Sequence, residues 1–125
     1  MLKMTFCLHR QPHLTREEFH KYWLEEHGPL VAKHAGALGI IRYVQNHAHT
    51  SKVNTAMQAT RGGLNEMYDG IAEAYFESWE SFFELSSTKE AAAASAILIE
   101  DEQKFIDFSR SPLWFNEQHI ILDET

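Results

Sequence analysis

Short runs in which apolar and polar residues alternate recur along this chain. Alternation of this kind, in residues that favour extended backbone, predicts four strands. Their expected ranges are 2–10, 40–47, 70–77 and 114–122. Helical patterns separate the first strand from the second and the third strand from the fourth. The expected order is therefore strand, helix, strand, strand, helix, strand, which is typical of an α+β, ferredoxin-like βαββαβ fold with an antiparallel sheet.

The residues before position 19 are typical of a helix N-terminus. Thr15 and Glu18 have the spacing of a capping box, in which the threonine side chain accepts a backbone N–H and the glutamate reaches back to the cap. Phe19 and Trp23 then begin an apolar stripe with helical spacing. We therefore expect both aromatic side chains to be buried against the sheet.

Gly28 and Pro29 interrupt this helical pattern. Glycine is a poor helix former, and proline lacks an N–H and disfavours a helical conformation in the residue before it. We expect a kink or break at His27, with the helix ending near Gly36. A histidine held at such a break lies beside backbone groups that have lost their helical partners, which suits a polar site. The alternative is a partly buried histidine hydrogen-bonded to a carbonyl.

The second half of the chain contains one long connection and a divided helical region. Residues 50–67 are polar and lack a sustained apolar period, so we expect a loop, and a loop of this length is a candidate lid. Helices are expected at 79–85 and 89–98, separated by a cap at 86–88. Residues 101–110 are expected to form a turn or short helix that packs Phe105.

Apolar side chains are expected on both faces of the second and fourth strands. The helices of this fold cover only one face of the sheet, so a monomer would expose the other to water. We therefore expect two copies to pack face to face, which closes an α/β barrel and forms a cavity beside each sheet. The residues concerned are Ile40 and Val44 opposite Ile41 and Tyr43, and Ile121 opposite Ile120 and Leu122.

Composition narrows the class of protein. The chain has 125 residues, 44% of them hydrophobic and 23% charged, as in a single soluble domain spanning 1–125. Its net charge of -7 without a basic cluster argues against nucleic-acid binding. We expect a cytoplasmic protein without a membrane partner, because neither a long apolar run nor a secretory signal is present. Cys7 is the only cysteine, so no internal disulfide can form, and we expect it to be buried.

Eight histidines raise the question of a metal site. His47 and His49 would lie on one strand face about 7 Å apart, but no third ligand is close in sequence. His20, His27 and His34 would be separated by about 10 Å at each helical step, too far for one ion. We expect no metal. We also expect no cofactor, because the chain lacks a P-loop or dinucleotide motif, and it shows no Ser-His-Asp arrangement.

Five segments, in this order, resemble the EthD family of the dimeric α/β-barrel superfamily. They are Phe19–Trp23, His27-x-Pro29-Leu30, Tyr43–His47, Tyr68–Glu73 and Phe105–Asp107. The resemblance implies a homodimer that binds a small organic ligand. It also implies lyase or isomerase chemistry, such as dehydration, decarboxylation or ring rearrangement. The family is further associated with bacterial degradation of ethyl tert-butyl ether, where its members look like accessory proteins.

His27, Tyr43 and Glu73 are the candidate catalytic residues. Histidine titrates near neutral pH, and a tyrosine hydroxyl can donate a hydrogen bond to an enolate or oxyanion. The resemblance matches His27 and Tyr43 to positions that similar barrel isomerases use for substrate. Core packing is the alternative for Tyr43, and a solvated carboxylate for Glu73. The candidate ligand-binding residues are Trp23, Tyr75 and Trp114, whose aromatic side chains would suit a flat, apolar, oxygen-bearing ligand.

Three hypotheses about function follow. The first is a cofactor-free lyase or isomerase acting on a small cyclic, aromatic or polyketide-like compound through His27. The second is a dimeric binding or accessory protein without catalysis. The third, drawn from the wider superfamily, is haem binding or haem breakdown, which would need a histidine facing an open cavity of haem size.

Overall fold

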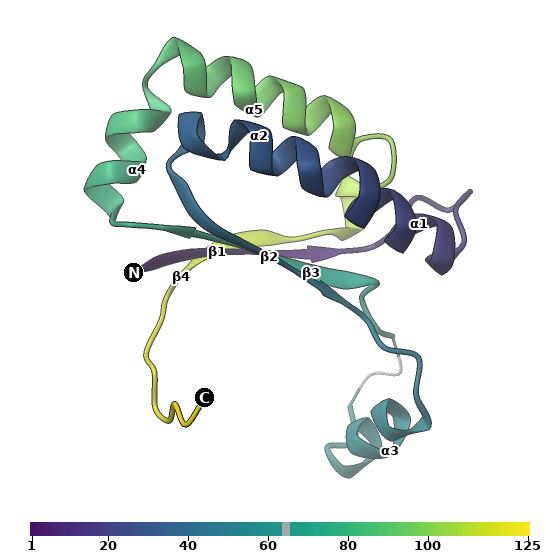
Figure 1. The fold of residues 1–125 in the computed structure, drawn as a ribbon. Helices are drawn as coiled ribbons and strands as arrows, with labels where there is room; N and C mark the ends of the chain where they lie inside the picture. Colours follow the sequence, from purple (N-terminus) through teal and green to yellow (C-terminus); the bar gives the residue numbers. More distant parts are fainter. Residues whose placement is uncertain (64–65) are drawn as a thin grey trace.

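Four antiparallel strands form a single sheet in the order β2-β3-β1-β4 (Figure 1). The strands are β1 (Leu2–Leu8), β2 (Ile40–His47), β3 (Gly70–Phe76) and β4 (Leu113–Glu117). The computed structural model describes residues 1–63 and 66–125. The two central strands, β1 and β3, pair from Leu2 opposite Phe76 to Leu8 opposite Gly70.

Helices cover one face of this sheet. They are α1 (Arg16–Tyr22), the π-helical turn η1 (Trp23–His27), α2 (Gly28–Leu38), α4 (Trp79–Ser86) and α5 (Lys89–Glu102), and η2 (Phe108–Arg110) is a short 3-10 turn before β4. In Figure 1, α2 and α5 run side by side above the sheet. The βαββαβ order and the α+β, ferredoxin-like class predicted from the sequence are confirmed. In the described part of the chain, no helix combines the length and the apolarity that a membrane crossing needs.

The core lies between the helices and the sheet. Leu2, Phe6 and Leu8 of β1 point toward the helices, as do the small residues Ala72 and Ala74 of β3. Because alanine leaves space above the sheet, large aromatic side chains can pack onto it. These are Phe19, Trp23 and Phe105, which are almost completely buried. The predicted burial of Phe19 and Trp23 is therefore confirmed, and each contributes about 1.5–3 kcal/mol by leaving water.

The first helix begins as predicted but does not break at His27. The capping box between Thr15 and Glu18 is present. A kink or a break was predicted, and the break is wrong, because the chain stays helical through η1 and α2; the irregularity at this place is the π-helical turn. The helix ends at Leu38, with Gly39 as its C-cap at a left-handed φ of 75°. In η1 the N–H of Gly28 donates to the carbonyl of Trp23, five residues back. This wider turn comes directly before Pro29, which has no N–H to donate, and the helix absorbs the proline there.

The segment predicted as a loop at 50–67 contains a helix, α3 (Lys52–Thr60). That prediction is wrong for these residues. Ser51 caps the helix by accepting the N–H of Val53, but α3 buries none of its residues. Helical periodicity of apolar residues arises from a buried face, and a helix without a buried face lacks this signal. Figure 1 shows α3 standing away from the sheet, on the side opposite the other helices. The part of the predicted loop at 64–65 lies outside the described residues.

Strands β4 and β2 both depart from the predicted pattern. β4 ends at Glu117, opposite Leu2, so no residue of β1 remains to pair with the chain that follows. The predicted strand residues after Glu117 are therefore wrong; Ile120, Ile121 and Leu122 lie outside the sheet and are exposed. β2 has an irregular register near its start. Ile40 and Tyr43 consequently both pack on the helix side, contrary to the predicted alternation.

Candidate functional site

The π-helical turn directs His27 into the interior. A step of four residues in an α-helix overshoots one full turn by about 40°, so repeated steps would carry a buried stripe toward solvent. A turn with more residues takes up this excess. Four residues spaced by four therefore stay buried along one stripe. They are Phe19, Trp23, His27 and Val31, which are 0%, 1%, 3% and 3% exposed.

A side chain of β2 holds this turn in place. Gln45 donates from Nε2 to the carbonyl oxygen of Trp23 at 2.8 Å. The same carbonyl accepts the N–H of Gly28. A Cβ on Gly28 would lie 3.4 Å from the Gln45 amide nitrogen, so the helix passes close over the strand at this point. The position of His27 relative to β2 is fixed by these contacts.

His27 is bound to Asp101, which lies in the last turn of α5. The two atoms, His27 Nδ1 and Asp101 Oδ2, are 2.8 Å apart, and the side chains are only 4% and 10% exposed. The other carboxylate oxygen of Asp101 accepts the hydroxyl of Tyr22 at 2.5 Å and lies 3.4 Å from Lys104 Nζ. A carboxylate on Nδ1 favours the tautomer that carries its proton there. Nε2 is then left as a free base.

Glu102 lies on the other side of the same ring. Its Oε2 is 3.8 Å from His27 Nε2, which is too long for a hydrogen bond, and its side chain is 19% exposed. Burial, followed by the charge of Asp101, raises the pKa of Glu102 to about 7. This carboxyl group therefore titrates much closer to neutral pH than a free glutamate does.

The pKa values of His27 and Asp101, the other two ionisable groups of the site, are both lowered, for different reasons. Burial lowers the pKa of His27, although the bond to Asp101 partly opposes the change. For Asp101, burial would raise the pKa, but hydrogen bonds from Tyr22 and His27 outweigh it and the pKa is lowered. At neutral pH the site therefore holds a neutral imidazole and an ionised aspartate.

Tyr43 of β2 points to the helix-covered face of the sheet, and His27 points into the same interior from η1. Its hydroxyl oxygen accepts Trp23 Nε1 and Gln45 Nε2, both at 3.3 Å. The pKa of Tyr43 is raised, chiefly by burial and also by the negative charge of Glu102. Both hydrogen bonds use the oxygen as acceptor, so the hydroxyl proton remains for donation. Tyr43 and His27 thus border the same interior, with Glu102 acting on both.

Glu73 is not brought to His27. It alternates with the inward-facing residues of β3 and so points to the helix-free face of the sheet, which we call the open face. There it binds Lys3, Asn46 Nδ2 at 2.7 Å and Tyr75 at 3.4 Å. Burial would raise the pKa of Glu73, but the bonds from Lys3 and Asn46 outweigh it, so the pKa is lowered. Glu73 is an ionised carboxylate with several partners.

The six residues predicted for the site therefore divide between two faces. His27, Tyr43 and Trp23 lie under the helices. Tyr75 and Trp114 share the open face with Glu73, as their strand positions require. Tyr75 is covered there by Arg42 and Lys3.

A cavity of about 440 Å³ approaches His27 from outside. Tyr22 and Phe105 line it, and both belong to the surroundings of the imidazole. Tyr22 binds Asp101, and the ring of Phe105 is 5.1 Å from that of His27. His27 itself is not among the residues lining this cavity. The cavity therefore reaches neighbours of the imidazole but not the ring itself.

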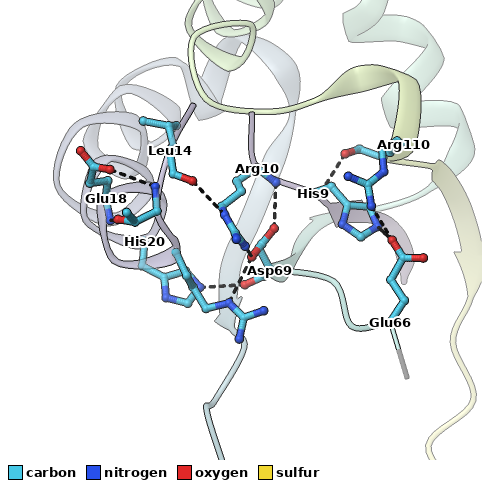
Figure 2. Close-up of polar contacts among 11 residues, drawn as sticks. His9, Arg10, Leu14, Glu18, His20, Glu66, Asp69 and Arg110 are labelled. Atoms are coloured by element: carbon cyan, nitrogen blue, oxygen red, sulfur yellow. Dashed lines mark hydrogen bonds and ion pairs between the residues drawn. The ribbon is translucent and has the colours of Figure 1, made fainter. Parts of the chain in front are cut away.

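A larger hollow of about 760 Å³ lies beside α3. Arg16, Met57 and Arg61 are among its lining residues, and none of the six predicted site residues is. Arg16 Nε also binds Asp69. Asp69 belongs to a partly buried polar network at the ends of the strands (Figure 2).

Asp69 is the centre of that network. Its carboxylate accepts the backbone N–H of Arg10 at 2.8 Å, the Arg10 guanidinium, and Arg16 Nε at 3.1 Å. Its carbonyl oxygen lies 2.7 Å from His20 Nε2. These contacts join β1, α1 and the start of β3 (Figure 2). Sequence analysis did not single out this aspartate for the site, and its contacts are those of a structural anchor.

Sequence reasoning missed Asp101, Glu102 and Tyr22 as site residues. Asp101 is 74 positions from His27, so no local spacing could pair them. One signal was available. Glu100, Asp101 and Glu102 occupy the end of α5 without a basic residue in its last turn, although the helix dipole disfavours negative charge there. Within the described residues, no three His, Cys, Asp or Glu side chains are arranged to hold a metal ion.

Comparison with known proteins agrees with this architecture. The EthD domain matches residues 11–109 of the sequence. The chain belongs to the EthD family. Among curated proteins, none matches at a significant level.

Solved structures show how far the family fold extends. An ethyl tert-butyl ether D (EthD) family protein from Bacillus halodurans C-125 has a TM-score of 0.60 at 19% identity, covering 95% of this chain and 100% of that one. An EthD-like protein from Ralstonia eutropha JMP134 has a TM-score of 0.57 at 14% identity, covering 99% and 96%. A dimeric ferredoxin-like protein of unknown function from Thermobifida fusca YX has a TM-score of 0.55 at 11% identity, covering 94% and 90%. At these identities the similarity shows the fold.

Proposed function

We propose that this EthD-family chain is one domain, residues 1–125, that acts as a cofactor-free lyase or isomerase on a small cyclic, aromatic or polyketide-like compound. The observation that carries the proposal is the 2.8 Å contact between His27 Nδ1 and Asp101. A buried carboxylate that orients an imidazole and stabilises its protonated form is a recurrent arrangement for proton transfer.

Each residue has a part in the proposed reaction. His27 Nε2 removes a proton from a carbon next to a carbonyl group. The electron pair moves to the carbonyl oxygen, where the Tyr43 hydroxyl donates a hydrogen bond to the enolate. Asp101 stabilises the imidazolium. In an isomerisation the imidazolium then returns the proton to another carbon, and in an elimination the departing hydroxyl group needs a proton of its own. General acid–base catalysis of this kind contributes about 10² to 10⁴ in rate.

Access requires a movement of side chains. Tyr22 and Phe105, which line the cavity of about 440 Å³, are also neighbours of the His27 site. We propose that the ligand enters by displacing these two rings, as ligands do when they complete a site on binding. The Tyr22 hydroxyl would then leave Asp101, which keeps its contact with His27.

We propose a homodimer formed through the open faces. Trp114 is 46% exposed on β4, and Ile71 of β3 is partly exposed on the same face. Figure 1 shows α3 and the C-terminal tail projecting on this side of the sheet. In the proposed dimer, both contact the second copy. The Thermobifida fusca relative in fold is described as dimeric, which supports this assembly.

A non-catalytic binding or accessory role is the second candidate. The enclosure of the His27 ring favours it, because only 3% of the residue is exposed in this state. Haem binding is the weakest candidate, since an axial histidine must face an open cavity and His27 does not.

Deuterium exchange tests the proposal without knowledge of the natural substrate. The probe is 1-tetralone, a flat ketone whose α-protons exchange slowly with D₂O, followed by NMR. The wild type should accelerate exchange, and His27→Gln should lower the accelerated rate by a factor of about 10² to 10⁴. Glu73→Gln, on the open face, should retain it. Binding without exchange would support the accessory role, and full exchange by His27→Gln would refute the assignment.

A further inference from the structure

We infer that Glu102 is a second proton-transfer residue of this site, which protonates the ligand on the side of the imidazole that Asp101 leaves free. The inference rests on the proposed function of His27 and adds a separate group to it. It assigns to the site a ligand that carries both an acidic C–H and an oxygen that must be protonated.

Two consecutive residues of α5 bracket the imidazole. Asp101 lies 2.8 Å from Nδ1 and Glu102 lies 3.8 Å from Nε2. The first contact is a hydrogen bond and the second is not. Nε2 and the Glu102 carboxyl group are therefore neighbours that each retain a free hydrogen-bonding position. A ligand group that lies beside both atoms, at hydrogen-bond distance from each, can contact both.

The surroundings of Glu102 favour a carboxyl group that carries a proton. His27 faces it from η1, its charge reaches Tyr43 on β2, and Asp101 precedes it on α5. Among the described residues, no Lys or Arg pairs with it, because Lys104 extends instead to Asp101 and is mostly exposed. Desolvation and the nearby aspartate raise the pKa of Glu102 to about 7, which suits an acid that works near neutral pH.

His27 Nε2 and the Glu102 carboxyl group lie side by side, and together they can carry out an elimination. His27 Nε2 takes the proton from the carbon next to a carbonyl group, and that C–H bond breaks. The C–O bond to a β-hydroxyl breaks as Glu102 gives its proton to the departing oxygen. The products are a C=C bond and water, with His27 protonated and Glu102 ionised. Transfer of the proton from His27 to Glu102 restores the starting state.

Two probes separate the roles of the two residues. 3-Hydroxy-1-tetralone loses water to give 1-naphthol, which is followed by absorbance, whereas deuterium exchange in 1-tetralone needs only the base. Glu102→Gln should lower the elimination by about 10² or more and leave exchange within a few-fold of wild type. His27→Gln should lose both. Glu100→Gln removes an exposed carboxylate from the same helical turn and should change neither.

Titration of the His27 ring gives a readout independent of activity. In ¹⁵N-histidine-labelled protein, followed by NMR from pH 4.5 to 9, the His27 signals should show a step near pH 7 that is lost in Glu102→Gln and kept in Glu100→Gln. If Glu102→Gln eliminates water at the wild-type rate while His27→Gln does not, Glu102 has no role and the proposed function stands. If neither probe reacts, an unchanged His27 titration in Glu102→Gln overturns the inference, and a lost step supports it.

Discussion

Gly70 lies against the ring of Trp23, with no space for a side chain between them. A Cβ on Gly70 would be 2.4 Å from the Cζ3 atom of Trp23 and 2.7 Å from the carbonyl oxygen of Asn46. Such distances force either the buried ring or the neighbouring backbone to move. Gly70→Ala should therefore lower the free energy of unfolding by about 1–3 kcal/mol, as overpacking does.

Gly36 provides the matched control. It is exposed within α2, and a Cβ there would meet nothing within 4 Å. Gly36→Ala should raise the free energy of unfolding by roughly 0.5–1 kcal/mol, because alanine favours a helix. Urea denaturation measures both variants. Equal effects of the two substitutions would contradict the packing described for Gly70.

Trp23 should be the most costly aromatic side chain to remove. It fills the space above Ala72 and Gly70, and its indole N–H binds Tyr43. Trp23→Ala should cost about 3–5 kcal/mol in urea unfolding, the usual range for a core aromatic. Leu24→Ala, next along the chain but exposed, should stay within about 0.5 kcal/mol of wild type. A loss below 1 kcal/mol for Trp23→Ala would mean that the ring is not packed as described.

His27 should contribute to stability as well as to chemistry. His27→Gln removes the ring that binds the buried Asp101 and leaves that carboxylate with Tyr22 and Lys104 alone. We expect a loss of roughly 2–4 kcal/mol in the free energy of unfolding, because breaking a buried charged contact leaves one partner uncompensated. His13→Gln, at an exposed position, is the control and should have almost no effect. A neutral His27→Gln would show that the contact with Asp101 is weak.

Glu102 should make stability fall as pH rises. Its pKa of about 7 lies above the value of 4.5 for a free glutamate, so the folded state binds the proton more tightly than the unfolded state. This contribution is complete below about pH 4.5 and is lost as pH rises through 7. It amounts to at most about 3 kcal/mol. His27, whose pKa is lowered, acts in the opposite direction, so the wild type should be compared with Glu102→Gln.

The measurement is urea unfolding at pH 5 and pH 8. The fall in stability between the two should be larger in the wild type than in Glu102→Gln, because glutamine does not ionise. Glu100→Gln should behave as the wild type does. A parallel pH dependence in the wild type and Glu102→Gln would show that the carboxyl group titrates in the folded state as it does in the unfolded chain.

The dimer should depend on Trp114. Sedimentation equilibrium at micromolar concentration should show a dimer, and Trp114→Glu should raise its dissociation constant by about 30-fold, which corresponds to roughly 2 kcal/mol for an interface aromatic. Phe83→Glu replaces an aromatic residue on α4 that is even more exposed than Trp114; it lies away from the open face, so this variant should leave the dimer intact. A monomeric wild type would contradict the proposed assembly.

Patterns among neighbouring residues predicted the helices and strands, whereas contacts between residues far apart in the sequence determine which side chains meet in the site. The alternation in 40–47 predicted β2 with its observed ends, and Thr15 predicted the helix start, because both signals reside in neighbouring residues. The pairing of His27 with Asp101 depends on how α5 crosses η1, and no short segment contains that information. Sequence reasoning also grouped Glu73 with His27 because strand position alone does not tell which face a helix will cover.

The π-helical turn between Trp23 and His27 contains one residue more than a plain α-helical turn would need. Removing one residue between Trp23 and His27 would allow a regular α-helix, in which three residues, or about 300° of rotation, would separate the two side chains. His27 would then stay close to its present side of the helix, because the wide turn accommodates the extra residue without redirecting the helix that follows. In related chains, a one-residue gap at this point would therefore be compatible with the same placement of the imidazole.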